Sequence, residues 1–300
     1  MQVRESAVAV RVPATSANLG PGFDAFGLAL GLYDEVTVRA MDFGVSIEIL
    51  GEGAQTLPRD ESHLLVRSAR ACLDRLGVGH IGLQVSCTNR IPHGRGLGSS
   101  SAAIVAGVTA ARALVPDGEK LLDDDALLAL ACELEGHPDN VAACLRGGFT
   151  VAWTGGDGPH VISLTPDERI HPVVFIPAAE LSTVRARGLL PDKVPHADAA
   201  SNAARAGLLV VALTSDPSLL LVATEDRLHQ DYRRLAMPLS LQLMESLRAQ
   251  GVAATISGAG PAVLALTDMA GVYRVGAAAG PGWRAERLAV DTVGATVRAA

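Results

Sequence analysis

The segment Pro92–Ala103 reads P-H-G-R-G-L-G-S-S-S-A-A. Glycine occupies positions 94, 96 and 98, and a run of small apolar residues typical of a helix follows the three serines. Glycines at this density let backbone N–H groups approach an anion that a Cβ atom would hold away. A helix N-terminus adds unpaired N–H groups and the positive end of the helix dipole. The segment therefore predicts a phosphate site, whose serine hydroxyls cap the helix or hold a metal ion.

Two common nucleotide-binding patterns do not fit this segment. A P-loop requires Lys-Ser or Lys-Thr after its last glycine, whereas the lysines of the chain are at positions 120 and 193. A dinucleotide fingerprint requires glycine or alanine where Ser101 stands. The segment Gly20–Ala25 (G-P-G-F-D-A) does fit that fingerprint, but it begins eight residues after a predicted strand at 6–12. We therefore disfavour a nucleotide-binding oxidoreductase, and the simpler alternative is a flexible loop before a capped helix.

The composition is that of a globular protein with an aliphatic core. Its 300 residues suit two domains or one large one. Hydrophobic residues make up 49% of the chain and charged residues 19%, which argues against a disordered chain. Aromatic residues contribute only 3% and the net charge is −7, so we expect no nucleic-acid partner.

The cysteines and the apolar runs indicate the cellular compartment expected for the protein. The four cysteines, at positions 72, 87, 132 and 144, show no C-x-x-C spacing, so we expect reduced, mostly buried thiols in a cytoplasmic protein. The first twelve residues carry charges within any candidate apolar stretch, and no apolar run approaches membrane-spanning length. We therefore expect neither a signal peptide nor a membrane partner.

Hydrophobic periodicity predicts strands and helices in both halves of the chain. Alternation predicts strands at residues 6–12, 33–40, 45–50 and 82–88, the second and third forming a hairpin around 42–44. We expect helices at 63–76, from 99 to about 114, and from a cap at 123–125 to Gly136. Several short strands over 149–176 lead to a domain boundary that divides the chain into 1–165 and 166–300. In the second half we expect helices at 195–214, 216–223 and 269–278, and strands around 255–265 and at 284–290.

Polar residues gather in two further segments. The Gly/Pro-rich loop at residues 14–30 contains Asn18 and Asp24. A second group contains Glu135, His137, Asp139 and Asn140. Both segments also have an ordinary interpretation, as a solvated loop and as a charged helix end followed by a proline turn. In that setting a histidine is more often a hydrogen-bonding loop residue than a catalytic base.

Two arginines in the second half allow two interpretations. Arg187 and Arg233 fit exposed helix positions, where most arginines belong. A planar, permanently charged guanidinium is also the best match for the carboxylate of a small substrate. The residue types alone favour the exposed positions.

Six motifs together resemble one family. P-x-x-x-G-L-G-S-S-x-A at residues 92–102 is similar to the ATP loop of the GHMP kinases, the superfamily of galactokinase and of homoserine, mevalonate and phosphomevalonate kinases. The segment V-P-A-T-S-A-N-L-G-P-G-F-D-A-F-G-L-A-L at 12–30 looks like the opening of the homoserine kinases in particular. The blocks E-G-H-P-D-N-V-A (135–142), L-S-T-V-R-A-R-G-L-L-P (181–191), D-Y-R-R (231–234) and T-I-S-G-A-G-P (255–261) follow in the family's order.

The resemblance implies a fold and a reaction. The fold would be α+β, with an N-terminal domain like ribosomal protein S5 domain 2, a ferredoxin-like C-terminal domain and the ligands at their junction. The reaction would be the ATP-dependent, Mg²⁺-assisted phosphorylation of the side-chain hydroxyl of L-homoserine in threonine biosynthesis. Homoserine and ATP would be the partners, and a homodimer is compatible with the sequence. Two alternatives are another GHMP kinase, whose substrate lacks the amino-acid head, and a non-enzymatic sensor on the same fold.

The resemblance also assigns residues to ATP and to the metal. ATP would be held by the loop residues Pro92, His93, Gly94, Arg95, Gly96, Leu97, Gly98, Ser99, Ser100, Ser101 and Ala102. Mg²⁺ would be bound by Ser100 and Glu135, with Glu133 as an alternative on a different helix face. His63 stands where homoserine kinases usually carry asparagine near the adenine, which leaves the adenine contacts open.

The remaining assignments concern the substrate. Asn18 and Asp24 would bind its ammonium group, and Arg187 and Arg233 its carboxylate. Two further residues, His137 and Asp139, would complete this site, and Asn140 would take part in catalysis. Asn140 falls where some sister kinases place an aspartate base, so the resemblance implies catalysis without a dedicated carboxylate base.

Overall fold

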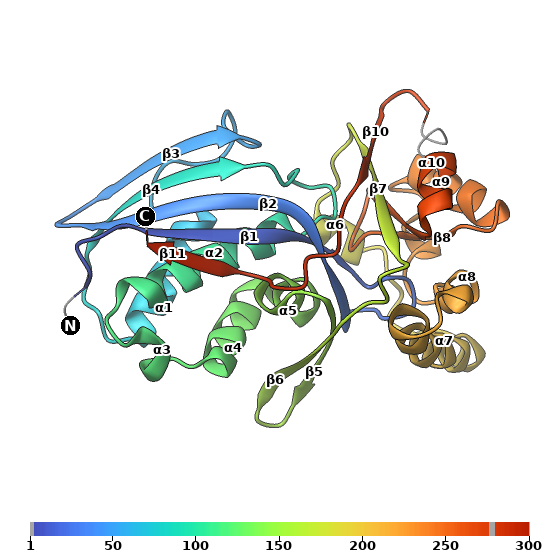
Figure 1. Cartoon of the computed structure of the whole chain (residues 1–300), viewed down its shortest axis with the longest axis horizontal. Helices are drawn as coiled ribbons and strands as arrows, with labels where there is room; N and C mark the ends of the chain where they lie inside the picture. Colours follow the sequence, from blue (N-terminus) through green and yellow to red (C-terminus); the bar gives the residue numbers. More distant parts are fainter. Residues whose placement is uncertain (1–2, 276–279, 300) are drawn as a thin grey trace.

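The computed structural model describes residues 3–275 and 280–299, which form two sheets with helices packed on them (Figure 1). In this part of the chain the larger sheet has seven strands: five follow the order β11-β1-β2-β4-β3, β5 pairs with β2, and β6 pairs with β5. The smaller sheet has the order β10-β7-β9-β8. The strands are β1 Val8–Ala17, β2 Phe26–Met41, β3 Val45–Gly51, β4 Gly82–Asn89, β5 Phe149–Gly155, β6 Gly158–Leu164, β7 His171–Pro177, β8 Ala253–Ile256, β9 Val263–Thr267, β10 Trp283–Arg287 and β11 Thr296–Ala299.

Strand β1 is longer than the sequence predicts. We expected the strand to end before Pro13, but it continues to Ala17. The register with β2 shifts between Pro13 and Ala14, and such an irregularity tolerates a residue that has no N–H to donate. The Gly/Pro-rich loop therefore shrinks to residues 18–25, the connection between β1 and β2.

The predicted hairpin around residues 42–44 is wrong. Strand β4 lies between β2 and β3: it is antiparallel to β2 and parallel to β3. Helix α1 (Leu64–Arg75) connects β3 to β4. Residues 46, 48 and 50 of β3 are exposed, whereas β4 is mostly buried, so β4 takes the inner position and β3 becomes the edge.

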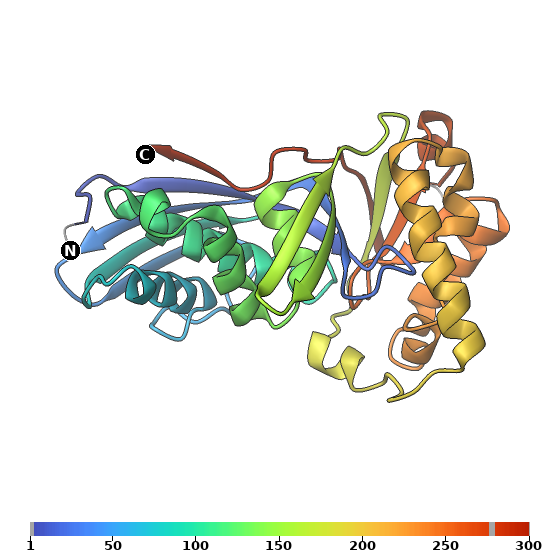
Figure 2. The same ribbon diagram turned by 90° about the horizontal axis from the view of Figure 1, so that it is seen from below.

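Five helices of the described chain lie on one face of the larger sheet (Figure 2). They are α1, α2 Ser99–Leu114, α3 Gly118–Leu121, α4 Asp124–Glu135 and α5 Pro138–Arg146. The small residues of α2 make it the buried central helix, and Gly107 lets α1 approach, because a Cβ atom there would lie 2.4 Å from the Leu65 carbonyl oxygen. Asp123 caps α4 by accepting from Ala126 N–H at 2.9 Å. Helix α5 was not predicted, although Pro138 occupies its first turn, where proline is well tolerated.

The smaller sheet has its own core and its own helices. These are α6 Thr183–Arg187, α7 His196–Thr214, α8 Leu220–Ala223, α9 Pro238–Ala249 and α10 Met269–Val275, with short 3₁₀ turns at η1 Pro217–Leu219 and η2 Asp231–Arg233. The core contains Phe175, Leu241 and Val263, all fully buried. The last residues of the helix predicted at 269–278 lie outside the described residues. The strand predicted at 284–290 is β10, which ends at Arg287.

The two sheets meet where the chain crosses from β6 to β7. The predicted division at residue 165 falls in this connection, with the strands of the two sheets on either side of it. One strand departs from that division, because β11 returns to pair with β1 of the larger sheet. Loop 18–25 reaches from the larger sheet to the smaller domain (Figure 2), where Asn202 Nδ2 donates to the Pro21 carbonyl at 2.7 Å.

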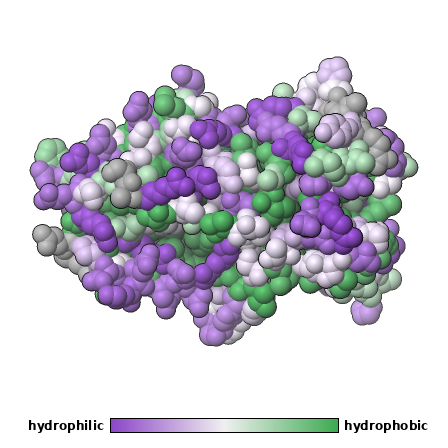
Figure 3. Space-filling model, in the orientation of Figure 1, coloured by the Kyte–Doolittle hydropathy of each residue, from purple (hydrophilic) through white to green (hydrophobic). Residues whose placement is uncertain are grey.

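The surface is mixed in polarity. Figure 3 shows hydrophilic residues spread over the visible face of both domains, with hydrophobic residues interspersed. None of the helices formed by residues 3–275 and 280–299 is both long and apolar enough to cross a membrane.

Candidate active site

The glycine-rich loop has a backbone that only glycine permits at two positions. Gly96 and Gly98 have φ of +77° and +71°, in the left-handed region that disfavours other residues. A Cβ atom would lie 2.2 Å from the Ser257 carbonyl oxygen at Gly96 and 2.0 Å from Thr15 Oγ1 at Gly98. Helix α2 begins directly after Gly98, and no side chain caps it. Its first N–H groups therefore remain available to an anion.

The turn between β8 and β9 braces this loop from the smaller domain. Ser257 Oγ donates to the Gly96 carbonyl at 2.7 Å, and Ala262 N–H donates to the Arg95 carbonyl at 3.0 Å. The Arg95 guanidinium forms an ion pair with Glu180 at 2.7 Å and donates to carbonyls of the smaller domain. Arg95 thus joins the domains with its side chain.

Glu135 faces the glycine-rich loop. Its Oε1 accepts from Ser100 Oγ at 2.6 Å and from Ser101 Oγ at 2.9 Å. Glu133 points elsewhere and pairs with Arg75 at 2.7 Å, with side chains 65% and 54% exposed. Glu133 and Glu135, the two candidate metal ligands, therefore lie on different faces of α4.

The residues at this position fit Mg²⁺ by their chemistry. Ser100 and Glu135 offer oxygen atoms, which this hard cation prefers. The described residues contain no group of three His, Cys, Asp or Glu side chains that could hold a metal. Mg²⁺ commonly binds through one or two protein oxygens together with substrate phosphates and water, so two oxygens beside a phosphate loop are a suitable set.

The N-terminus of α5 arranges three of the expected polar residues. Asp139 Oδ1 accepts from Asn140 N–H at 2.7 Å and lies 2.8 Å from His137 Nδ1. Asn140 Oδ1 accepts from Thr15 Oγ1 at 2.8 Å. Burial lowers the pKa of His137, but the hydrogen bond to Asp139 and the charges of Asp139 and Glu135 outweigh burial and raise it above 6.5. Sequence reasoning did not place Thr15 in the site; a polar residue in a buried strand is the signal that would have found it.

Loop 18–25 holds the expected ammonium ligands in an unusual backbone. Asn18, Leu19 and Asp24 have positive φ of 67°, 50° and 54°, which Asn and Asp tolerate better than most residues. Asn18 Nδ2 donates to the Gly258 carbonyl at 2.9 Å, and its Oδ1 accepts from Asp24 N–H at 3.0 Å. The Asn18 amide thus fixes the loop. Asp24 forms a two-pronged ion pair with Arg187 at 2.6 and 3.0 Å.

Arg233 is buried, contrary to the exposed position that residue statistics favour. Its residue is 1% exposed, and the guanidinium donates to the carbonyls of Ala186 and Gly258 at 3.3 and 3.2 Å. NH1 also lies 3.1 Å from Nδ1 of His229, a buried residue that sequence reasoning missed. Within residues 3–275 and 280–299, Arg233 forms no ion pair. Burial, and then the charge of Arg187, lowers the pKa of Arg233 to about 10.

Two cavities meet at the start of α2. The first, here called the polar cavity, has a volume of about 170 Å³. It is lined by Asn18, Gly94, Gly96, Gly98, Ser99, Ser100, Glu135, His137, Asp139, Asn140, Leu181, Ser182, Thr183, Arg187, Arg233, Gly258 and Ala259. The second, the apolar cavity, has about 210 Å³. It is lined by Val12, Asp34, Val36, Leu57, His63, Leu64, Leu65, Cys87, Asn89, His93, Ser99, Ser100, Ala102, Ala103 and Ala106.

The predicted site residues are distributed unequally between the two cavities. The polar cavity brings together twelve of them, from both domains. Asp24 does not line it but contacts Arg187, which does. Ser101 reaches Glu135 without lining either cavity. His93 and Ala102 line the apolar cavity instead. Pro92, Arg95 and Leu97 line neither.

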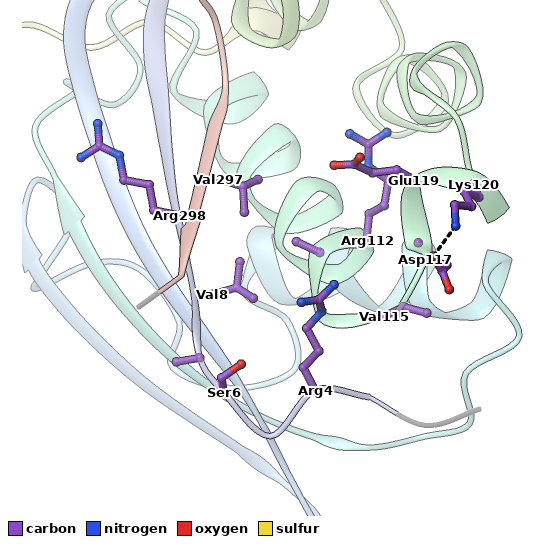
Figure 4. A pocket seen from close by; sticks show the side chains of 13 residues that line it. Arg4, Ser6, Val8, Arg112, Val115, Asp117, Glu119, Lys120, Val297 and Arg298 are labelled. Carbon is purple, nitrogen blue, oxygen red and sulfur yellow. Dashed lines mark hydrogen bonds and ion pairs between the residues drawn. The ribbon is translucent and has the colours of Figure 1, made fainter.

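A larger cavity at the far end of the larger domain has a different character (Figure 4). It has about 340 Å³ and is bordered by the C-terminal end of α2, the start of β1 and β11. Its Lys120 pairs with Asp117 at 2.7 Å, and its Arg112 with Asp124 at 2.7 Å. It contains none of the predicted site residues, so volume alone does not identify the functional site.

The phosphate loop, the serine–carboxylate pair beside it and the two-domain α+β fold define a kinase of the GHMP class. The family model for the GHMP kinases N terminal domain matches residues 63–148, and that for GHMP kinases C terminal matches residues 210–280. The expected fold class is confirmed.

Relatives narrow the class to one activity. The chain is 62% identical over 294 residues to a homoserine kinase from Streptomyces avermitilis, covering 98% of this chain and 96% of the relative. It is 50% identical to a homoserine kinase from Clavibacter michiganensis subsp. michiganensis, covering 97% and 94%. A crystal structure of homoserine kinase from Cytophaga hutchinsonii superimposes with a TM-score of 0.85 at 30% identity over 99% of both chains. The chain belongs to the homoserine kinases, ATP-dependent enzymes of threonine biosynthesis.

Proposed function

We propose that the polar cavity binds L-homoserine next to the phosphates of ATP, and that its hydroxyl receives the γ-phosphoryl group there. The supporting observation is Arg233, a buried guanidinium that lines the cavity and has no carboxylate partner among the described residues. A buried cation without a counter-ion destabilises the fold, and the carboxylate of an amino acid would supply that counter-ion. The loop that would carry the phosphates borders the same cavity.

The Asp24–Arg187 ion pair supports recognition of a zwitterion. Its two side chains are 35% and 36% exposed, so a ligand can reach them. We propose that the substrate divides this pair: its carboxylate binds Arg187 and Arg233, and its ammonium binds Asp24. A ligand with only one of the two charges would separate the pair without replacing both partners. Asn18 would act by holding Asp24 in place, because its amide already bonds the loop.

The loop and the serine–carboxylate pair would hold the phosphates. The N–H groups at the start of α2 and the loop glycines would bind phosphate oxygens. Ser100 and Glu135 would hold Mg²⁺, which when bound neutralises charge that develops on the transferred group. His137 and Asp139 would shape the remaining wall, since the bond between them fixes the His137 ring beside Glu135.

No side chain needs to act as a dedicated base. Phosphoryl transfer depends mainly on alignment and on charge stabilisation. We propose that Asn140, held by Thr15 and by the start of α5, positions the substrate hydroxyl. All these residues come from one chain, so a single chain would be the catalytic unit even within a homodimer. A cytoplasmic location is proposed as well, supported by the four free cysteines.

The experiment is a crystal structure with L-homoserine and a non-hydrolysable ATP analogue. We expect both ligands in the two cavities, with the carboxylate on Arg187 and Arg233 and the Asp24–Arg187 pair opened. Homoserine bound away from Arg233 would contradict the proposal. An intact Asp24–Arg187 pair in the complex would contradict the division of charges but not the site.

A further inference from the structure

His229 is a fully buried side chain to which the proposed function gives no role. It lies between α8 and η2 in the smaller domain. The turn that carries it is held by Asp226, whose Oδ2 accepts from the N–H groups of His229 and Gln230 at 3.1 and 2.8 Å. The turn thus holds the backbone of His229 without help from the imidazole, and the role of the ring needs a separate explanation.

The imidazole connects two parts of the proposed acceptor site. On one side, Nε2 lies 2.8 Å from the carbonyl oxygen of Gly20, in loop 18–25. On the other side, Nδ1 lies 3.1 Å from NH1 of Arg233. The Phe23 ring of the same loop packs on the imidazole, with ring centroids 5.1 Å apart. His229 therefore joins the proposed carboxylate ligand to the loop that carries Asp24, the proposed ammonium ligand.

The two partners of the ring fix its protonation state. A carbonyl oxygen can only accept and a guanidinium can only donate, so Nε2 carries the proton and Nδ1 offers its lone pair. A second proton would place two donors against each other at Nδ1. Burial lowers the pKa of His229 below 6.5, and the charge of Arg233 lowers it further. The carboxylates of Asp226 and Asp24 oppose this shift without reversing it. The ring is therefore neutral.

The hydrogen bonds of Arg233 determine how its guanidinium is oriented. Nε donates to the Ala186 carbonyl, and NH1 donates to the Gly258 carbonyl and to Nδ1 of His229. These three bonds leave the two N–H groups of NH2. NH2 donates to none of the described residues and is not among their buried atoms without a partner. It therefore stays accessible from the polar cavity, which Arg233 lines.

We propose that His229 is a positioning residue for the acceptor: its neutral imidazole orients Arg233 and holds it at a fixed distance from loop 18–25. The inference rests on the proposed function, in which Arg233 binds the carboxylate of the substrate and Asp24 its ammonium group. An α-amino acid carries both charges on one carbon, so its two partners must keep their spacing to bind it together. His229 does not line the polar cavity, and it acts through Arg233.

Two variants separate the two bonds of the ring. His229→Asn places an amide oxygen near the position of Nδ1, where it can still accept from Arg233. His229→Gln places its amide nitrogen near the position of Nε2, where it can donate to Gly20 but no longer supports Arg233. We expect His229→Gln to raise KM for homoserine about threefold to tenfold, the effect of one lost hydrogen bond. His229→Asn should raise it much less.

The controls separate positioning from stability. In both variants kcat and KM for ATP should change much less than KM for homoserine does in His229→Gln. His196→Gln, at an exposed histidine of the smaller domain, is the matched control and should change none of these constants. In an Arg233→Ala background, His229→Gln should leave KM for homoserine unaltered, because the interaction that it disturbs is already lost. A merely structural role would instead lower Tm equally in both variants and add to KM in that background.

A spectroscopic measurement tests the wild-type protein directly. With ¹⁵N-labelled histidine, one ring should keep the neutral Nε2–H signature at about pH 6, where exposed histidines are largely protonated. This signal should be absent from His229→Asn, and homoserine should shift it. A protonated ring, equal KM for homoserine in His229→Gln and the wild type, or additive losses with Arg233→Ala would overturn the inference and leave the proposed function intact. If Arg233→Ala itself left KM for homoserine unchanged, the proposed function would fail and the inference with it.

Discussion

The two cavities on either side of Ser99 and Ser100 differ in the polarity of the side chains that line them. The polar cavity is lined by several charged side chains, one of them the buried Arg233. The apolar cavity is lined mainly by aliphatic side chains, together with the buried His63, whose ring nitrogens have no partner in the described chain. Buried charge costs stability unless it is paired, so we expect an anionic group of the ligand to pair with Arg233. The apolar cavity instead offers mainly aliphatic surface for a ligand to bury.

The cavities also differ in which part of the chain builds them. All lining residues of the apolar cavity fall between Val12 and Ala106, within the larger domain. The polar cavity combines residues of both domains, from Asn18 to Ala259. If the polar cavity binds the acceptor substrate as proposed, we expect its recognition to depend on both domains. Variants of the residues that line the polar cavity test this division.

The largest effect is expected from the carboxylate that faces the loop. Glu135→Ala should lower kcat by about 100-fold or more, because the group proposed to hold the metal is lost from a site of electrostatic stabilisation. Glu133→Ala is the matched control two residues away, and its exposed ion pair contributes little. Steady-state kinetics with a thermal melt of each variant checks this. If Glu133→Ala proved the more damaging change, the assignment of the metal ligand would be wrong.

The next effect concerns affinity for the acceptor. Arg187→Ala and Arg233→Ala should each raise KM for homoserine more than tenfold, because a charge-assisted hydrogen bond contributes about 1.5–3 kcal/mol. KM for ATP should change much less, and Asp24→Asn should act like the arginine variants through the ammonium end. Arg185→Ala, on the exposed side of the same helix α6, is the control. Equal effects on KM for ATP and for homoserine would contradict the proposal that these arginines bind homoserine specifically.

A substrate analogue sharpens the same prediction. Homoserine without its carboxylate should bind the wild type poorly but lose little further affinity in Arg187→Ala or Arg233→Ala, since the same interaction is removed twice. Additive losses in this cycle would show that the arginines do not face the carboxylate. The enzyme should phosphorylate an alcohol that lacks the amino-acid head much more slowly than homoserine. Equal rates would contradict the proposed recognition of the ammonium and carboxylate groups.

A smaller effect is expected at the hydroxyl. Asn140→Ala should lower kcat about fivefold to tenfold with little change in KM, because the substrate hydroxyl is misplaced and Thr15 Oγ1 loses its partner. Thr15→Val keeps the volume and removes only the bond that holds Asn140, so its effect should be milder. Kinetics at saturating ATP distinguishes the two variants. A rise in KM with unchanged kcat would argue against a positioning role.

Most of the fold was predictable because hydrophobic periodicity reports local structure. Helices α1, α2 and α4 form where the apolar spacing and the Asp123 cap predicted them. The exceptions depend on non-local pairing. The insertion of β4 between β2 and β3 depends on pairing between strands that are distant in the sequence, and no local pattern distinguishes that arrangement from a hairpin. The return of β11 to β1 is equally invisible in the sequence, because four residues at the chain end carry no partner information.

The site residues were predictable mainly from the family motifs, and less from the chemistry of the residue types alone. The motifs named the loop and Glu135, and the structure brings them within hydrogen-bond distance. Residue statistics alone placed Arg233 on the surface, yet tertiary packing buries it against His229. The partnership of Asp24 with Arg187 links residues 163 positions apart, and such a contact cannot be derived from one sequence. Only the structure reveals that the imidazole of His63 is unpaired.

The smallest effect is expected at His137. If phosphoryl transfer depends on alignment of the substrate hydroxyl and not on a base, His137→Ala should lower kcat less than about threefold. The shape of the pH–rate profile should then stay unchanged. Its stability effect should depend on pH. Because neighbouring carboxylates raise its pKa above 6.5, His137 binds its proton more tightly in the folded than in the unfolded state. This stabilisation is fully present below the unfolded pKa and is lost as the pH rises through the folded one. Urea unfolding should therefore show a larger loss for His137→Ala at about pH 5.5 than at about pH 8.5. An acidic limb of the wild-type rate profile that disappears in the variant would instead identify His137 as the base, and the polar cavity would then act by proton transfer as well as by charge.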